Sequence, residues 1–300
     1  MHPNPRFLNR SNAFWGYAQL ISEKLKYSKG GNVKTYTSND VIKKLNELDI
    51  NLDDEIVKDV LDYLNFRADI LNNKIKHFFM DVEKARYTFK RLHNYYQEQN
   101  FTCSLPFNKQ KREKKDYAYF TCIINILTEK YLRKYADANG LVYGKDIYFD
   151  DDPRQLTYLK DENNYIGGIL SRRFDGAFPE TINPKAIWEI KEYYYTTTFG
   201  SRIADGVYET QLDGHEINEL AEFTKDDINH IYFIDDYNTW WNMGKSYLCR
   251  IIDMLHKGLV DEVIFGEEVL LRWEYVLSVI VEGKKSDTVE PHNQVVKEVK

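Results

Sequence analysis

This 300-residue chain has few cysteines and no long apolar run, and each shortage excludes a class of protein. Its three cysteines, Cys103, Cys122 and Cys249, are far apart and include no C-x-x-C pair. We therefore expect free thiols, with neither a disulfide framework nor a zinc site. No stretch approaches the roughly 18 apolar residues of a membrane span, and the first ten residues lack the apolar core of a signal peptide. These absences predict a protein of the bacterial cytoplasm that does not enter a membrane.

The overall charge is also low. The formal net charge is -6, and the hydrophobic (43%) and charged (29%) fractions are those of an ordinary soluble protein. An acidic balance argues against a chain that coats nucleic acid non-specifically, although a local basic surface is compatible with it. The length allows one large domain or two modest ones.

Residues 1–107 are predicted to form a helical region. Apolar residues recur at helical spacing from Phe14 to Leu25, and further helices are expected to start at Ser38 and Asp53. Residues 74–80 form a candidate strand. Two helices and a strand are compatible with a winged-helix or helix-turn-helix module that contacts DNA. The alternative is a helical region without a role in DNA reading.

Residues 108–116 form a basic linker, residues 117–283 form a second region, and residues 284–300 are expected to be a flexible tail. In the second region, strands and helices alternate, which predicts a mixed α/β (α+β) fold with a central mixed sheet flanked by helices. The expected helices are 117–136, 201–221 and 243–258. The expected strands are 146–149, 165–170, 171–178, 186–195, 230–235 and, as one strand or a pair, 262–276.

Three charged residues in this region indicate a chemical site. Asp175 ends one expected strand, Glu189 lies on the next, and Lys191 follows two positions later. Because side chains alternate along a strand, Glu189 and Lys191 share one face, whereas Trp188 and Ile190 point into the core. Charged side chains on a central strand are costly unless they are paired or bind something. An exposed hairpin with a weak ion pair between Glu189 and Lys191 is the alternative.

Two carboxylates supply the hard oxygen ligands that Mg²⁺ prefers, with water and a substrate phosphate completing the shell. A metal ion at Asp175 and Glu189 polarises a phosphoryl oxygen and stabilises a departing alkoxide. Lys191 would orient or deprotonate the attacking water, or neutralise charge in the transition state. The residue types therefore fit metal-assisted hydrolysis of a phosphodiester.

The pattern D-x13-E-I-K, framed by helix, strand, strand, helix and strand, resembles the core motif of the PD-(D/E)xK nuclease superfamily. The resemblance covers residues 117–276 and implies that Asp175 and Glu189 are metal ligands and that Lys191 is catalytic. Members often add an acidic residue from the preceding helix, for which Glu129 is the candidate. The sequence departs from the pattern at Phe174, where the superfamily has a proline.

The resemblance implies a restriction-endonuclease-like core and a Mg²⁺-dependent type II endonuclease that cuts double-stranded DNA at a specific sequence. Such enzymes usually act as homodimers, because two identical sites suit a two-fold symmetric target. A non-specific phage or defence nuclease is one alternative. A DNA-binding regulator without enzymatic activity, using the helices between residues 38 and 71, is another.

Several neighbours of the trio are candidate DNA contacts: Arg172, Arg173, Tyr193, Ser201 and Arg202. The arginines would hold phosphates near the metal, and a helix that begins near Ser201 would favour an anion at its N-terminus. Ordinary exposed or core-packing roles are the alternative for all five.

Residues 243–246 (MGKS) resemble the end of a nucleotide-binding phosphate loop. Thr239 stands where that motif requires its first glycine, so no nucleotide cofactor is expected.

Overall fold

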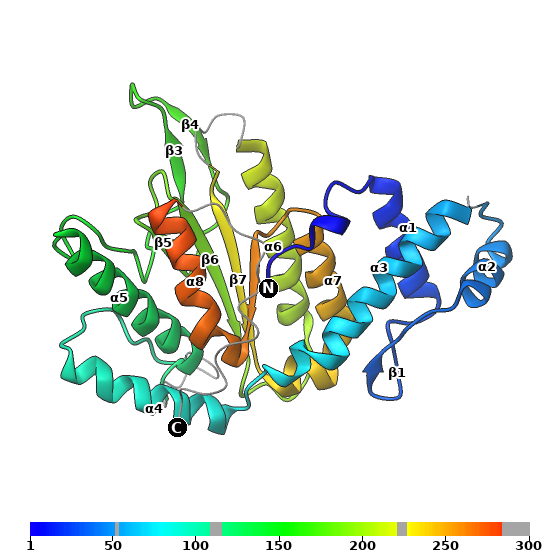
Figure 1. Ribbon diagram of the computed structural model, residues 1–300, viewed down its shortest axis with the longest axis horizontal. Coiled ribbons are helices and arrows are strands. Elements are labelled where there is room, and N and C mark those ends of the chain that lie inside the picture. Colours follow the sequence, from blue (N-terminus) through cyan, green and yellow to red (C-terminus); the bar gives the residue numbers. More distant parts are fainter. Residues whose placement is uncertain (52–53, 109–115, 221–226, 284–300) are drawn as a thin grey trace.

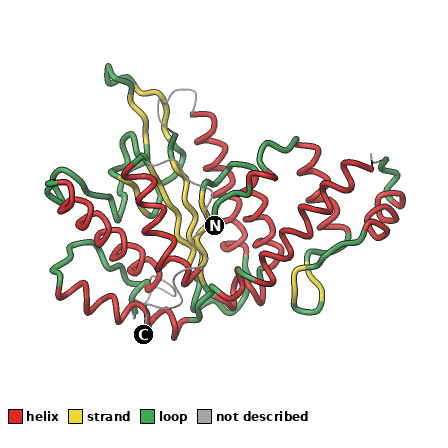
Figure 2. The backbone as a smooth tube through the Cα atoms, viewed as in Figure 1, coloured by secondary structure: helices red, strands yellow, loops and turns green. Residues whose placement is uncertain are grey.

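The computed structural model describes residues 1–51, 54–108, 116–220 and 227–283. The expected basic linker, apart from its two end residues, and the whole expected tail lie outside these residues. The described part is a mixed α/β protein whose central mixed sheet is flanked by helices, which confirms the predicted fold class (Figures 1 and 2).

The N-terminal part is helical, as expected. It contains α1 (Asn12–Lys24), α2 (Ser38–Glu47) and α3 (Asp54–Asn73), together with a short 3-10 helix (Pro5–Phe7) and a small hairpin of β1 (Ser28–Lys29) and β2 (Asn32–Val33). Ser11 caps α1 by accepting a hydrogen bond from the Phe14 amide, and Thr37, one residue before the expected cap, does the same for α2. Trp15, Tyr63 and Leu64 lie in the apolar cluster that holds these helices together.

The strand expected at residues 74–80 is not formed. A 3-10 helix (Ile75–His77) turns the chain from α3 into α4 (Val82–Glu98). Ile75 and Phe79 both reach the same apolar cluster, a spacing of four that suits a helix as well as a strand, so the sequence pattern did not exclude the turn.

The hydrophobic clusters divide the chain near this turn. The α4 residues Ala85 and Phe89 belong to the same cluster as α5 (Tyr119–Asn139), the helix expected at residues 117–136. Helix α4 therefore packs with the C-terminal region, although it lies within the range 1–107 assigned to the N-terminal region from the sequence.

The central sheet contains β5 (Gly176–Phe178), β6 (Ala186–Glu192), β7 (Asn229–Asp235) and β8 (Glu262–Phe265), in that order. β5 is antiparallel to β6, whereas β6, β7 and β8 are parallel. Helices α5 and α8 (Val269–Glu282) cover one face, and α6 (Ser201–Leu220) and α7 (Lys245–His256) cover the other (Figure 1). A separate hairpin, β3 (Tyr158–Lys160) and β4 (Ile166–Ile169), projects beyond the sheet (Figure 1).

Three expected strands differ from the structure. Residues 266–276, expected to be strand, form a 3-10 turn (Gly266–Glu268) and most of α8, because Val269, Trp273 and Val276 recur at helical spacing and pack on the core. Residues 146–149 contribute an isolated bridge in place of a strand. The expected strand 171–178 is paired in the sheet only from Gly176 to Phe178.

Gly176 is required where β5 meets β6. A Cβ atom at this position would lie 2.1 Å from the ring of Trp188, its partner in the antiparallel register. The absence of a side chain lets the large Trp188 ring fill the core beneath β5, next to Trp273. The same close pairing places Asp175, the residue before Gly176, beside Glu189.

Candidate functional site

A cleft of about 1460 Å³ lies where β5 begins and β6 ends, beside the first turns of α6. Most of the residues singled out from the sequence line this cleft: Arg172, Arg173, Asp175, Lys191, Tyr193, Ser201 and Arg202. Glu189 does not line the cleft, since only 2% of its surface is exposed, but it is bound to Arg172 and Lys191, which do. One cleft thus gathers side chains from β6, α6 and the segment before β5.

Asp175 extends the pairing of β5 with β6 by one residue, through its backbone amide and its side chain. Its backbone amide donates to the Trp188 carbonyl (3.0 Å), and its carboxylate accepts a hydrogen bond from the Ile190 amide (2.8 Å). Asp175 is exposed to solvent at the mouth of the cleft. Desolvation by the surrounding protein, and then the neighbouring Glu189 carboxylate, raise the pKa of Asp175 to about 7.

Glu189 and Lys191 share one face of β6, as the alternation of a strand requires. The Lys191 ammonium donates to Glu189 Oε2 at 2.6 Å. On the opposite face, Trp188 and Ile190 are buried in the core. Burial lowers the pKa of Lys191, but the Glu189 and Asp175 carboxylates more than offset this effect, so the net shift is upward and Lys191 is held in its charged form.

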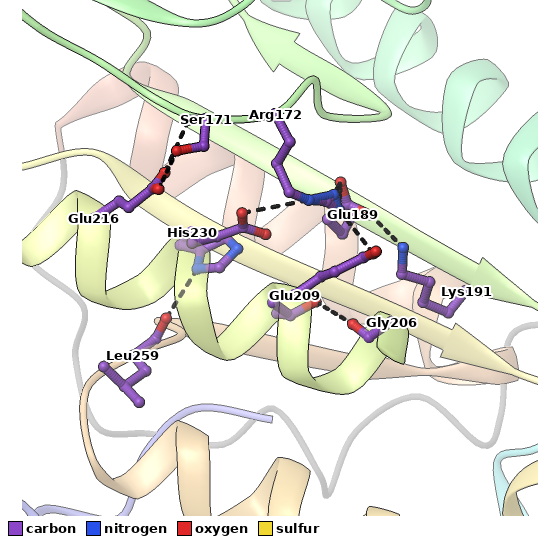
Figure 3. A network of polar contacts seen from close by, with 11 residues as sticks. Ser171, Arg172, Glu189, Lys191, Gly206, Glu209, Glu216, His230 and Leu259 are labelled. Carbon is purple, nitrogen blue, oxygen red and sulfur yellow. Dashed lines mark hydrogen bonds and ion pairs between the residues drawn. The ribbon is translucent and has the colours of Figure 1, made fainter. Parts of the chain in front are cut away.

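Arg172 also binds Glu189. Its two terminal nitrogens lie 2.8 Å (Nη1) and 2.5 Å (Nη2) from Glu189 Oε1, and Figure 3 shows the guanidinium between β6 and α6. Its Nε lies 3.4 Å from Asp213 Oδ1, and Nη2 lies 3.9 Å from the exposed Glu209 carboxylate. Arg172 is therefore bound to the acids of the site while it also lines the cleft.

Asp213 and His230 complete this polar cluster, and both are about 1% exposed. Burial raises the pKa of Asp213 to about 7, although Arg172 counteracts part of this effect. His230 contacts the Leu259 carbonyl through Nδ1 at 2.8 Å (Figure 3), and burial lowers its pKa to about 4, so its ring is neutral.

Glu192 adds a carboxylate on the other face of β6. It accepts hydrogen bonds from the Phe120 amide (2.7 Å) and the Thr121 hydroxyl (3.2 Å) at the start of α5, and it lines the cleft. Burial raises the pKa of Glu192 to about 7. Asp175 contributes to that shift, so negative groups from both faces of β6 act on one another.

Glu129, the expected additional metal ligand, is not brought to this site. It is fully buried on α5 and accepts hydrogen bonds from the amides of Thr102 and Cys103 and from the Arg133 guanidinium. Its carboxylate fixes the segment after α4 and does not line the cleft. A helix position alone did not reveal which way the side chain points.

Asp213, Glu192 and His230 were not among the site residues expected from the sequence. Asp213 lies on the buried side of α6 with Thr210 and Ile217, and an acid at a position where the helical pattern expects an apolar residue is a detectable signal.

Two carboxylates, Asp175 and Glu189, offer oxygen ligands to a metal ion. Within residues 1–51, 54–108, 116–220 and 227–283, no three His, Cys, Asp or Glu side chains are grouped so that they could hold a metal ion. Mg²⁺ needs fewer, because it keeps several waters and binds through one or two carboxylates and a substrate phosphate. Desolvation is the main cause of the raised pKa of Asp175, and the neighbouring Glu189 carboxylate adds to it. The residues fit this metal.

None of the described helices is long and apolar enough to cross a membrane.

Comparison with known proteins divides the chain at the turn between α3 and α4. Residues 80–280 match a family described as a domain of unknown function (DUF7687), and residues 1–74 match a second domain of unknown function (DUF7690). No curated protein and no solved structure matches the chain significantly. Because the first match spans more than half of the chain and contains the whole cleft, this protein belongs to the DUF7687 family.

Proposed function

We propose that this protein is a Mg²⁺-dependent DNA endonuclease related to the PD-(D/E)xK superfamily. The observation that carries the proposal is that Asp175 and Lys191 line one cleft and that Lys191 is bound at 2.6 Å to the buried Glu189. Asp175 and Glu189 are joined by a hairpin, and the antiparallel register of β5 and β6 brings them side by side. An accidental D-x13-E-x-K match has no reason to place its three residues together at a cleft.

The order of elements supports the same assignment. The order α5, β5, β6, α6 and β7 corresponds to the helix, strand, strand, helix and strand frame of that superfamily, with the separate β3–β4 hairpin inserted between α5 and β5. The central sheet is mixed and covered by helices on both faces. We therefore propose a restriction-endonuclease-like core.

Asp175 and Glu189 would hold the metal ion. When bound, Mg²⁺ would act as a Lewis acid toward the phosphate and stabilise charge on the departing oxygen. Lys191 is charged, because the carboxylates around it raise its pKa. It therefore acts in the proposed reaction by orienting water and neutralising the developing negative charge, and not by accepting a proton.

Other groups of the cleft would bind the DNA backbone. Arg173, Ser201 and Arg202 are exposed and line the cleft, and the two α6 residues lie in the first turn of a 20-residue helix. A helix N-terminus attracts phosphate. The Tyr193 hydroxyl lies nearby, close to Gly206 of the same helix. Arg172 is bound to Glu189, so its first role is inside the site.

Within this proposal the substrate is double-stranded DNA, cut at a specific sequence by a homodimer, as in type II restriction enzymes. Two identical cuts on opposite strands require two sites. The helices of the N-terminal part are the proposed surface for holding or reading the duplex.

Plasmid cleavage tests the proposal. The full chain is incubated with plasmid DNA and Mg²⁺, then with EDTA, beside Lys191→Ala and Asp175→Ala. Lys134→Ala is a matched control, because Lys134 is 72% exposed on α5 and does not line the cleft. We expect metal-dependent cutting by the parent and the control but not by the two site variants.

The products separate the alternatives. Discrete fragments support a site-specific enzyme, whereas a smear supports a nuclease without strict specificity. Retained DNA binding without metal-dependent cutting by the parent protein would contradict the enzyme and favour a DNA-binding regulator.

A further inference from the structure

Asp213 is a buried carboxylate without a hydrogen-bond partner. It is 1% exposed, and neither of its oxygens has such a partner among the described residues. Its nearest cation, Arg172, lies 3.4 Å away through Nε. Burying an ionisable group without full pairing is costly. An acid at this position therefore needs a reason beyond packing.

The hydrogen bonds of Arg172 are unevenly divided. Both of its terminal nitrogens approach a single oxygen of Glu189, while Asp213 is left with the longer contact. The other oxygen of Glu189 is taken by Lys191 at 2.6 Å. Both oxygens of Glu189 thus face a protein cation, whereas both oxygens of Asp213 remain available to accept hydrogen bonds.

Of the groups in this cluster, Arg172 has the most freedom to move. It lies in the segment between β4 and β5, outside any strand, and its side chain is 22% exposed. Lys191 is confined by α6, since a Cβ on Gly206 would lie 3.3 Å from Lys191 Cε. Asp213 is fixed because the adjacent Gly214 lets α6 pack against the Leu259 backbone, where a Cβ would meet the carbonyl oxygen at 2.2 Å.

We propose that Asp213 is a positioning residue that receives the Arg172 guanidinium when Glu189 binds a divalent cation. In the metal-free protein, Arg172 occupies the position of the cation at Glu189. When the metal ion binds, Arg172 moves to Asp213, which accepts its hydrogen bonds. Arg172 already contacts both acids, at 2.5 Å from Glu189 and 3.4 Å from Asp213, so a rotation of its side chain completes the exchange. The inference rests on the proposed metal site, and it explains why a carboxylate with free acceptors is buried beside an arginine.

Mn²⁺ binding to the full chain without DNA tests this proposal, measured by isothermal titration calorimetry. Arg172→Gln removes the competing cation, so we expect about tenfold tighter Mn²⁺ binding, within the usual range of coupling between sites. Asp213→Asn removes the carboxylate to which Arg172 moves and should weaken Mn²⁺ binding about tenfold. Glu219→Gln, an exposed acid on the same helix, should leave the affinity unchanged.

The double variant distinguishes positioning from direct ligation. If Asp213 acts only through Arg172, then Arg172→Gln with Asp213→Asn binds Mn²⁺ as Arg172→Gln alone does. A further loss of affinity in the double variant would make Asp213 a metal ligand and overturn the proposal. If Asp213→Asn does not fold, the Mn²⁺ affinity of Arg172→Gln is the deciding measurement. An affinity no higher than that of the parent protein overturns the proposal.

Two other outcomes separate this inference from the proposed function. Equal Mn²⁺ affinities in all variants would overturn the inference and leave the nuclease proposal standing. No Mn²⁺ binding by the parent or by Arg172→Gln would overturn both.

Discussion

Two arginines of this protein lie beside buried aspartates, and the two pairs are built differently. Arg67 of α3 is fully buried, and its Nη1 atom donates to both oxygens of Asp253 on α7 at 2.8 and 2.9 Å. Tyr63 adds a hydrogen bond to the same carboxylate, and Ser22 accepts one from Arg67 Nη2. We call these four residues the closed network. It joins the N-terminal helices to the helices of the sheet.

The pair at the cleft is open. Arg172 is partly exposed, shares its donors between two acids, and leaves Asp213 without a hydrogen bond. We call Arg172, Glu189, Lys191 and Asp213 the open network. A network whose groups are nearly all satisfied rigidifies a structure, whereas one with acceptors left over can rearrange around a ligand. The comparison separates groups that hold this fold together from groups that we propose act on a substrate.

The largest expected effect is on the proposed reaction. Lys191→Gln in the open network should lower the single-turnover rate of DNA cleavage about 10³-fold, because a positioned charge at the reacting phosphate is lost. Arg67→Lys in the closed network should keep the parent rate per folded molecule, although lysine lacks the second nitrogen that donates to Ser22. Comparable losses of cleavage rate in both variants would contradict the distinction between the open and the closed network.

The next effect is on stability. Asp253→Ala leaves Arg67 charged and buried without its partner, so the free energy of unfolding should fall by about 3–5 kcal/mol. Asp213→Asn removes a poorly paired buried charge, and we expect a change of less than about 1 kcal/mol, of either sign. Urea unfolding followed by tryptophan fluorescence measures both. A larger loss for Asp213→Asn would mean that the open network is structural.

A smaller loss is expected at the strand pair that carries Asp175. Gly176→Ala places a Cβ against the Trp188 ring, so overpacking should cost about 1–3 kcal/mol of unfolding free energy. Gly16→Ala is the matched control, since Gly16 lies exposed in α1 with nothing near its absent Cβ, and alanine there should stabilise the protein by about 0.5–1 kcal/mol. Equal effects of the two substitutions would contradict the tight β5–β6 contact.

The smallest effect is a pH dependence of stability in the metal-free protein. The pKa of Asp175 is raised from 3.8 to about 7, so the folded state holds a proton that the unfolded state has released. Stability therefore falls as pH rises from about 4 to about 7. Asp175→Asn lacks this contribution and should gain stability relative to the parent across that window, measured by urea unfolding at several pH values. Asp205→Asn, an exposed acid of the cleft, is the control. A constant difference between Asp175→Asn and the parent would contradict the raised pKa.

Local patterns were sufficient for much of the fold. The helices α1, α5 and α6 and the strands β6 and β7 lie close to the ranges expected from apolar spacing, because that spacing reflects which face each element buries. The wrong predictions occurred where a short apolar run is compatible with both a helix and a strand. The start of α8 was expected to be strand, and its packing against α5 decided otherwise.

The sequence by itself determined that Glu189 and Lys191 share a face of one strand, since alternation is a property of the backbone. It also predicted Asp175 on a neighbouring strand, but at the end of that strand, whereas in the structure Asp175 comes just before β5 begins. Only the tertiary structure decided which third acid lies beside Asp175 and Glu189. Glu129 lies on the expected helix but is used to fix the segment after α4, whereas Asp213 comes from a helix that packs on the opposite face of the sheet. Contacts between distant segments depend on how the elements pack, and no local pattern encodes that packing.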